Sequence, residues 1–295
     1  MADAHPERAL TPDVVTTIAE LRTRVLTARR ADAAIGLVPT MGALHDGHAS
    51  LAARARHDNG CVVASIFVNP LQFDRTDDLE AYPRTLEADV AALGALGVDL
   101  VFAPSPEEMY PVPPEMGIDV GRLGDHLCGR FRPGHFRGVA TVVMKLLQIV
   151  QPDRAYFGEK DAQQLAIIRR LVADFNLPVD IVGMPTLREA DGLALSSRNR
   201  RLLPEQRPLA LALIRALSAA RHAIEAGETS TETVRALASR EVPSHDAVRL
   251  EYLEVVDPVN LQPLERISGP VLLAGALWVG SVRLIDSLRC GPNAS

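Results

Sequence analysis

The sequence predicts an α/β protein with a Rossmann-like, doubly wound parallel sheet and a smaller C-terminal α+β domain. Continuously apolar stretches such as 61–68 and 98–102 alternate with stretches of helical spacing, the pattern of parallel strands covered by helices on both faces. After Asn199 the order changes to helices followed by three strand-like runs, which is typical of a separate α+β domain. We therefore expect two domains, residues 1–188 and 189–295.

The composition limits the class of protein. The chain has 295 residues, of which 47% are hydrophobic and 23% charged, with a net charge of −6 and a pI near 5.8. This acidic balance argues against a nucleic-acid surface, and no apolar run is long enough to span a membrane. The three cysteines lack CxxC spacing, which favours the reducing cytoplasm over a disulfide framework. Residues 1–10 lack a signal-peptide core, and we expect a loose tail there.

The first elements lead to a turn. Residues Thr11–Asp13 resemble a helix start, and residues 14–30 have helical spacing. The apolar run 33–38 predicts a short buried strand, which we expect Pro39 to end. Residues 49–56 favour a helix.

The turn between this strand and this helix carries two histidines. Gly42 and Gly47 allow the backbone to turn tightly where a side chain would clash, and His45 and His48 lie close to the expected helix start. Ligands of open α/β sheets bind at such a position, and a helix amino terminus favours an anion. Two surface histidines or a zinc pair are the alternatives, although no nearby residues complete a tetrahedral zinc set. We favour a phosphate site.

Neutral amide side chains follow the apolar strand 61–68. Asn69 and Gln72 can orient a hydroxy acid, because they donate and accept hydrogen bonds without adding charge. In isolation, Asn69-Pro70 is also a common turn. We expect a helix over 79–97 and a third strand over 98–102.

A second strand–turn–helix unit surrounds Lys160. Tyr156 and Phe157 end a strand, Gly158 turns, and residues 162–173 have helical spacing. A long cation beside a helix amino terminus can reach a triphosphate, although a solvated surface patch is the alternative. Gln163 and Gln164 are expected to face into or beside the same crevice.

The segment after the strand 179–183 carries Ser196, Ser197 and Arg198. Their hydroxyl and guanidinium groups can hold phosphates that gain charge, whereas the alternative is a simple helix cap. The C-terminal domain that follows is expected to contain helices at 204–226 and 230–240 and strands at 248–256, 270–278 and 282–286.

Five strings of the sequence resemble one family. They are PTMGALHDGH at 39–48, VNPLQF at 68–73, RPGHFRGV at 132–139, GEKDAQQ at 158–164 and READGLALSSRN at 188–199. Together they are similar to the pantoate–β-alanine ligases, which belong to the nucleotidyltransferases with an HxGH signature. The resemblance runs from about Ile35 to about Arg289.

The resemblance implies an ATP site and its catalytic residues. His45, His48, Lys160, Ser196, Ser197 and Arg198 would act on the phosphates. The residues expected to contact ATP are Met41, Gly42, Ala43, Leu44, His45, Asp46, Gly47, His48, Gly158, Glu159, Lys160, Asp161, Leu187, Leu195, Ser196, Ser197 and Arg198. Leu195 stands where the family has methionine, and the similar volume leaves adenine contacts through the backbone intact.

The resemblance also implies the remaining ligands. Gln72, Gln164 and Asn69 would bind pantoate, Asp89 would bind Mg²⁺, and the arginines of 127–138 would line the pocket wall or a subunit contact. The C-terminal domain would act as a lid, and the chain would form a homodimer.

The implied reaction joins pantoate to β-alanine through an acyl adenylate. A cytidylyl- or adenylyltransferase of the same superfamily is one alternative, against which the intact VNPLQF and GEKDAQQ strings argue. An inactive nucleotide-binding or interaction protein is the other, yet every expected phosphate ligand is present. We expect small-molecule partners only, with no nucleic acid and no membrane.

Overall fold

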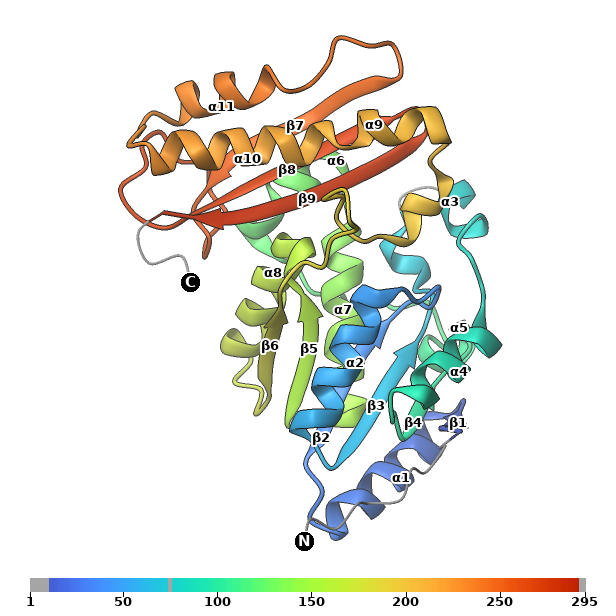
Figure 1. Cartoon of the computed structure of the whole chain (residues 1–295). Helices are drawn as coiled ribbons and strands as arrows, with labels where there is room; N and C mark the ends of the chain where they lie inside the picture. The colour runs from blue at the N-terminus through green and yellow to red at the C-terminus, as the bar shows by residue number, and fades with distance from the viewer. Residues whose placement is uncertain (1–10, 74–75, 292–295) are drawn as a thin grey trace, which may run out of the picture. The chain divides into compact units, whose positions relative to one another are not determined.

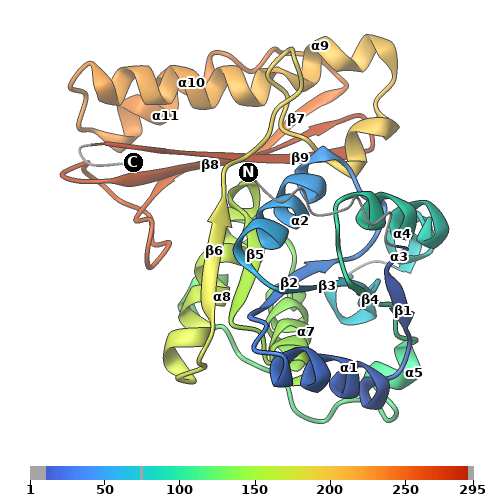
Figure 2. The ribbon, with the colours of Figure 1, turned by 60° about the horizontal axis from the view of Figure 1, so that its bottom comes forward.

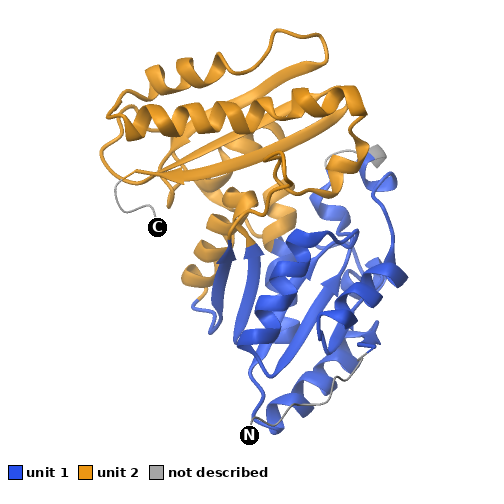
Figure 3. Ribbon diagram, in the orientation of Figure 1, with its two compact units in different colours: residues 1–117, 141–157, 176–184 blue, residues 118–140, 158–175, 185–295 orange. Residues whose placement is uncertain are grey.

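The computed structural model describes residues 11–73 and 76–291, which form two compact units (Figure 3). The first unit comprises residues up to 117 together with 141–157 and 176–184, and the second comprises 118–140, 158–175 and the residues from 185 onward.

This division differs from the expected boundary at residue 188. Residues 158–175 belong to the second unit because they contact its C-terminal strands. For example, the Ser287 hydroxyl lies within hydrogen-bonding distance of the carbonyl oxygens of Glu159 (3.2 Å) and Lys160 (3.5 Å). The order of the predicted helices and strands does not reveal contacts between segments that lie so far apart in the sequence.

The first unit is built on a six-stranded sheet in the order β1-β4-β3-β2-β5-β6 (Figure 1). The pairs β1–β4, β4–β3, β3–β2 and β2–β5 are parallel. The strands are β1 (Asp13–Val15), β2 (Ile35–Thr40), β3 (Cys61–Ile66), β4 (Leu100–Phe102), β5 (Arg154–Gly158) and β6 (Asp180–Met184). From β2 the chain builds outward to β3 and β4, and later to β5 and β6 on the other side. The strand order therefore reverses at β2, which is where doubly wound sheets bind ligands.

Helices cover both faces of this sheet, as the sequence predicts (Figure 2). On one face, Leu51 and Ala52 of α2 and Leu93 of α4 pack against Val62 and Val101 of the strands, while α1 and α7 lie on the other face. The helices are α1 (Ile18–Arg30), α2 (Asp46–Asp58), α3 (Thr76–Glu80), α4 (Leu86–Ala95), α5 (Pro106–Met109) and α7 (His135–Val150), with a 3₁₀ turn η1 (Pro70–Gln72).

The N-terminal predictions need correction. The expected helix 14–30 begins only at Ile18, because Thr17 caps it through the Glu20 N–H at 3.3 Å and Asp13–Val15 pair with β4. Pro39 does not end β2, which continues to Thr40. The Phe67 N–H donates to the Thr40 carbonyl, so the backbone of Pro39 points away from β3. Within the described residues, β2 pairs with β5 only at Gly36 and Leu37. Proline has no backbone N–H, and at position 39 no hydrogen bond to β5 is lost for that reason.

The predicted helix 79–97 is also wrong, because two short helices replace it. α3 ends at Glu80 and α4 begins at Leu86. Pro83 lies between them, and a proline disfavours helical backbone at its own position and at the preceding residue.

The second unit contains the predicted antiparallel sheet, in the order β7-β8-β9. Leu213 and Leu217 of α10 pack with Leu273 and Leu277 of β8 in its core, which confirms the α+β domain. Its elements are η2 (Gly121–Gly124), α6 (Leu127–Phe131), η3 (Glu159–Asp161), α8 (Ala162–Asp174), η4 (Ser197–Arg201), η5 (Pro204–Gln206), α9 (Arg207–Ala210), α10 (Ala212–Glu225), α11 (Thr231–Ser239), β7 (Val248–Val256), β8 (Val271–Val279) and β9 (Val282–Cys290). Across the described residues of both units, no helix is both long and apolar enough to cross a bilayer.

Candidate active site

The turn after β2 is held in a narrow conformation. Gly42 and Ala43 both have positive φ angles, +81° and +52°, so the prediction that Gly42 provides the turn is confirmed. The Thr40 hydroxyl donates to the Ser65 carbonyl at 2.7 Å and accepts the Gly42 N–H at 3.2 Å. These bonds fix the turn to the end of β3.

The two histidines cap the helix that follows. His45 is the N-cap of α2, and its Nδ1 accepts the Gly47 N–H at 3.1 Å. In return, the His45 N–H donates to Nδ1 of His48 at 3.4 Å, and the two rings lie 4.1 Å apart. Because Nδ1 accepts in both rings, the proton of each neutral imidazole is on Nε2. Both Nε2 atoms are therefore donors at a helix amino terminus.

A side chain at Gly47 would clash, as the sequence predicts. Gly47 is not among the glycines with positive φ, so its backbone angles alone do not require glycine. A Cβ at this position would lie 2.8 Å from the His45 ring, and a side chain would displace the ring. Gly47 therefore allows His45 to fold over the helix start.

Asp89 of α4 binds the same turn. Its Oδ2 accepts the Ala43 N–H at 2.9 Å and the Thr85 hydroxyl at 3.0 Å, and its Oδ1 accepts the Leu44 N–H at 2.9 Å. The residue is 4% exposed. Among the described residues, no group of three or more His, Cys, Asp or Glu side chains is arranged to hold a metal ion.

The predicted amide pair lies at the carboxyl end of β3. Asn69 is fully buried, and its Nδ2 donates to the Gln72 Oε1 at 3.0 Å. The Tyr110 hydroxyl donates to the Asn69 Oδ1 at 3.0 Å, and the ammonium of Lys145 lies 5.3 Å from the Tyr110 ring centre. Burial raises the pKa of Tyr110 to about 12, so its hydroxyl stays protonated. Sequence reasoning missed Tyr110 and Lys145, because no local pattern connects them to Asn69.

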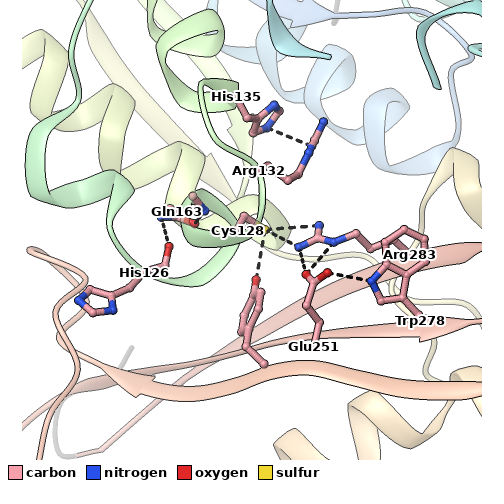
Figure 4. Close-up of polar contacts among 10 residues, drawn as sticks. His126, Cys128, Arg132, His135, Gln163, Glu251, Trp278 and Arg283 are labelled. Carbon is pink, nitrogen blue, oxygen red and sulfur yellow. Dashed lines mark hydrogen bonds and ion pairs between the residues drawn. The ribbon is translucent and has the colours of Figure 1, made fainter. Parts of the chain in front are cut away.

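In the second unit, the two adjacent glutamines differ. Gln163 is buried, and its Nε2 donates to the carbonyls of Leu123 at 2.8 Å and His126 at 2.9 Å (Figure 4). Its Oε1 accepts the Gly129 N–H at 3.4 Å. Gln163 therefore fixes the chain before and within α6. Gln164 is only partly buried and keeps its predicted role as a hypothesis.

The basic segment 127–138 is attached to the antiparallel sheet through Cys128. The Cys128 thiol lies 3.2 Å from the Tyr252 hydroxyl and 3.5 Å from Nη2 of Arg283 (Figure 4). Arg283 also pairs with Glu251, which accepts the Trp278 indole N–H at 2.8 Å. Burial raises the pKa of Tyr252 well above its usual value. These contacts give the segment a structural attachment within the second unit.

The loop before η4 is braced by ion pairs. Arg188 pairs with Asp286 at 2.6 Å, and Arg207 pairs with Glu189 at 2.6 Å and with Asp191 at 2.7 Å. Hydrogen bonds from Arg207 are the largest cause that lowers the pKa of Glu189 and of Asp191. Both carboxylates therefore stay ionised and hold the loop.

Ser196 caps η4, which agrees with the helix cap that the sequence offers as the alternative to phosphate binding. Its Oγ accepts the Arg198 N–H at 3.3 Å, and the hydroxyl proton remains available as a donor. The Leu195 N–H donates to the Leu187 carbonyl at 2.9 Å, which brings these two predicted ATP contacts together.

The predicted residues are divided between the two units. The first unit holds Met41–His48, Asp89, Asn69 and Gln72, and the second holds Glu159–Asp161, Gln164, Leu187 and Leu195–Arg198, with Gly158 at the junction of β5 and η3. A histidine pair at a helix amino terminus, where a parallel sheet reverses its strand order, is the geometry of an α/β protein that binds an anionic ligand.

Comparisons with known proteins specify the family. The matching family model, pantoate-beta-alanine ligase, covers residues 13–289. A pantothenate synthetase from Moorella thermoacetica is 52% identical over 276 residues, which cover 94% of this chain and 98% of that relative. The chain therefore belongs to the pantoate–β-alanine ligase family, which confirms the resemblance of the five strings.

Solved structures agree with this assignment. A pantothenate synthetase from Thermus thermophilus matches with a TM-score of 0.89 and 47% identity, covering 95% of this chain and 100% of that chain. A pantoate-beta-alanine ligase from Francisella tularensis, complexed with Beta-gamma ATP and β-alanine, matches with a TM-score of 0.78 and 34% identity, covering 94% and 97%.

Proposed function

We propose that this chain condenses pantoate with β-alanine at the expense of ATP. The pantoate carboxylate attacks the α-phosphorus of ATP, which gives pantoyl adenylate and pyrophosphate. The β-alanine amine then attacks the acyl carbon and releases AMP and pantothenate. The observation that carries this proposal is the family match over residues 13–289, and the ATP- and β-alanine-bound relative supports it.

The histidine pair stabilises charge during adenylate formation. Because the Nδ1 atoms of His45 and His48 accept backbone N–H groups, their Nε2 protons are held in fixed directions. Donors that are already oriented stabilise developing phosphate charge without reorganising, and the amino end of α2 adds its dipole.

Lys160, Ser196, Ser197 and Arg198 are the further residues that we propose for phosphate binding. Lys160 lies in η3, the turn that directly precedes α8, and the Ser196 hydroxyl keeps a proton to donate. Around the nucleotide we propose contacts from Met41, Gly42, Ala43, Leu44, Asp46, Gly47, Gly158, Glu159, Asp161, Leu187 and Leu195.

Pantoate is bound by amides in this proposal. The hydrogen bond from Asn69 occupies Oε1 of Gln72, and this fixes which way the Gln72 amide points. The Gln72 Nε2 group is then oriented as a donor, and Gln164 is a further ligand. Neutral donors orient the pantoate without neutralising the carboxylate, which has to act as a nucleophile.

Magnesium is expected to enter with ATP, as the MgATP substrate. Oxygens of phosphates are its preferred ligands, together with waters and one or two carboxylates. The carboxylate predicted for this role, Asp89, is already occupied by three donors, and we derive no step from it as a metal ligand.

We also propose a cytoplasmic location and a homodimer. The location is supported by Cys61, Cys128 and Cys290, which are all buried and unpaired with one another. The dimer rests on the family resemblance alone, and its state is measurable by sedimentation.

Isotope exchange tests the reaction. With pantoate and Mg²⁺ present and β-alanine absent, the enzyme should exchange labelled pyrophosphate into ATP, because only the first half-reaction releases pyrophosphate. A nucleotidyltransferase acting on phosphate esters would show no exchange driven by pantoate, and a binding protein would show none with any acid. Absence of exchange while ATP and pantoate both bind would exclude the proposal.

A further inference from the structure

The carboxylate of Asp89 faces hydrogen-bond donors on both of its oxygens. The N–H groups of two successive residues, Ala43 and Leu44, donate to Oδ2 and Oδ1 at 2.9 Å each, and Thr85 adds a hydroxyl to Oδ2 at 3.0 Å. These donors place the positive ends of their dipoles where a cation would approach. The three hydrogen bonds leave this carboxylate little acceptor capacity for Mg²⁺, which demands near-ideal octahedral geometry.

The turn that Asp89 binds is unfavourable by itself. Gly42 and Ala43 both have left-handed backbone angles, and alanine rarely adopts them. Buried N–H groups also need acceptors. Hydrogen bonds to a carboxylate are the stronger kind, so Asp89 supplies both acceptors and stabilises the turn.

This turn leads directly into the histidine pair. Leu44 precedes His45, whose N–H donates to Nδ1 of His48. A change in the direction of the 43–44 peptide groups would therefore turn the N-cap of α2 and both rings.

We propose that Asp89 is a positioning residue that orients the nucleotide-binding turn and the histidines, and is not a ligand of magnesium. This inference rests on the proposed function for the identity of the nucleotide. It predicts that ATP binding depends on Asp89 whether or not a metal ion is present.

The test variant is Asp89→Asn, which keeps the size of the side chain but can accept only one of the two N–H groups. The Nδ2 group of the asparagine would face either the Ala43 or the Leu44 N–H, and two donors cannot form a hydrogen bond. One charge-assisted hydrogen bond to the turn is therefore lost. We expect ATP to bind about tenfold more weakly. Glu87→Gln is the matched control, because Glu87 is exposed on the first turn of the same helix and loses the same charge. It should bind ATP as the unmodified enzyme does.

The deciding measurement is calorimetric titration with ATP in the presence of a metal chelator and, separately, with MgATP. A positioning role predicts the same loss of affinity in both titrations, with the Mg²⁺ concentration for half-maximal rate and the KM for pantoate unchanged. Unchanged metal-free ATP affinity in Asp89→Asn would overturn the proposal, as would a rise confined to the Mg²⁺ requirement.

A second measurement needs no variant. The amide protons of Ala43 and Leu44 should exchange slowly with deuterium in the unliganded, metal-free enzyme, and rapid exchange would overturn the proposal even where Asp89→Asn fails to fold. If the enzyme lacks pantoate-dependent exchange of pyrophosphate, the proposed reaction fails. The chelator titration still decides the role of Asp89.

Discussion

Replacing His48 by alanine is expected to slow the formation of pantoyl adenylate by about 100- to 1,000-fold. The His48 Nδ1 accepts the His45 N–H at 3.4 Å, so the ring presents its Nε2 proton to the phosphates. Removal of one such oriented donor costs about 2.7–4 kcal/mol of transition-state stabilisation. The fold should tolerate the change, because a long hydrogen bond of 3.4 Å contributes no more than about 1 kcal/mol to stability.

The assay is a single turnover with excess enzyme, ATP and pantoate and no β-alanine, quenched over time to follow the adenylate. His57→Ala is the matched control, since His57 lies at the other end of the same helix with 83% of its side chain exposed. Its rate should equal that of the unmodified enzyme. Near-normal adenylate formation by a folded His48→Ala protein would refute the role of the ring.

Two further predictions concern substrate binding and pH. Gln72→Ala should raise the KM for pantoate far more than the dissociation constant of ATP, because a buried substrate group loses its partner; steady-state kinetics beside calorimetry measures both, and equal losses would place Gln72 elsewhere. Asp58 has a pKa lowered from 3.8 to about 2, with the hydrogen bond to His57 as the largest cause. A lowered pKa in the folded state means that the stabilisation is present above about pH 4 and is lost as the pH falls through about 2. Asp58→Asn should therefore lower the melting temperature at pH 7 and have little effect near pH 2, and an equal change at both pH values would contradict this.

Local patterns predicted the sheet except for β1, and two of the errors involve prolines. Pro39 was expected to end a strand but lies inside β2, whereas Pro83 was overlooked and separates α3 from α4. The cost of a proline depends on whether a neighbouring strand or turn needs its N–H. That neighbour is decided by the tertiary structure, so sequence spacing alone cannot distinguish the two cases.

In the candidate site, too, local features could be predicted from the sequence and contacts between distant residues could not. The strand, the positive φ of Gly42 and the helix start are properties of successive residues, and the sequence predicts them. The contacts of Asp89 with Leu44 and of Tyr110 with Asn69 join residues 45 and 41 positions apart, and no local periodicity carries that information.

Gln163 and Gln164 show why residue type cannot replace geometry. Both are glutamines in the first turn of α8, yet a step of one residue turns the side chain by about 100° around the helix axis. That rotation directs Gln163 to three backbone groups of residues 123–129. Gln164 has a different environment and stays partly exposed. Two adjacent glutamines of one motif therefore differ in role: Gln163 holds the backbone of the second unit, and Gln164 is the one that we propose to bind pantoate.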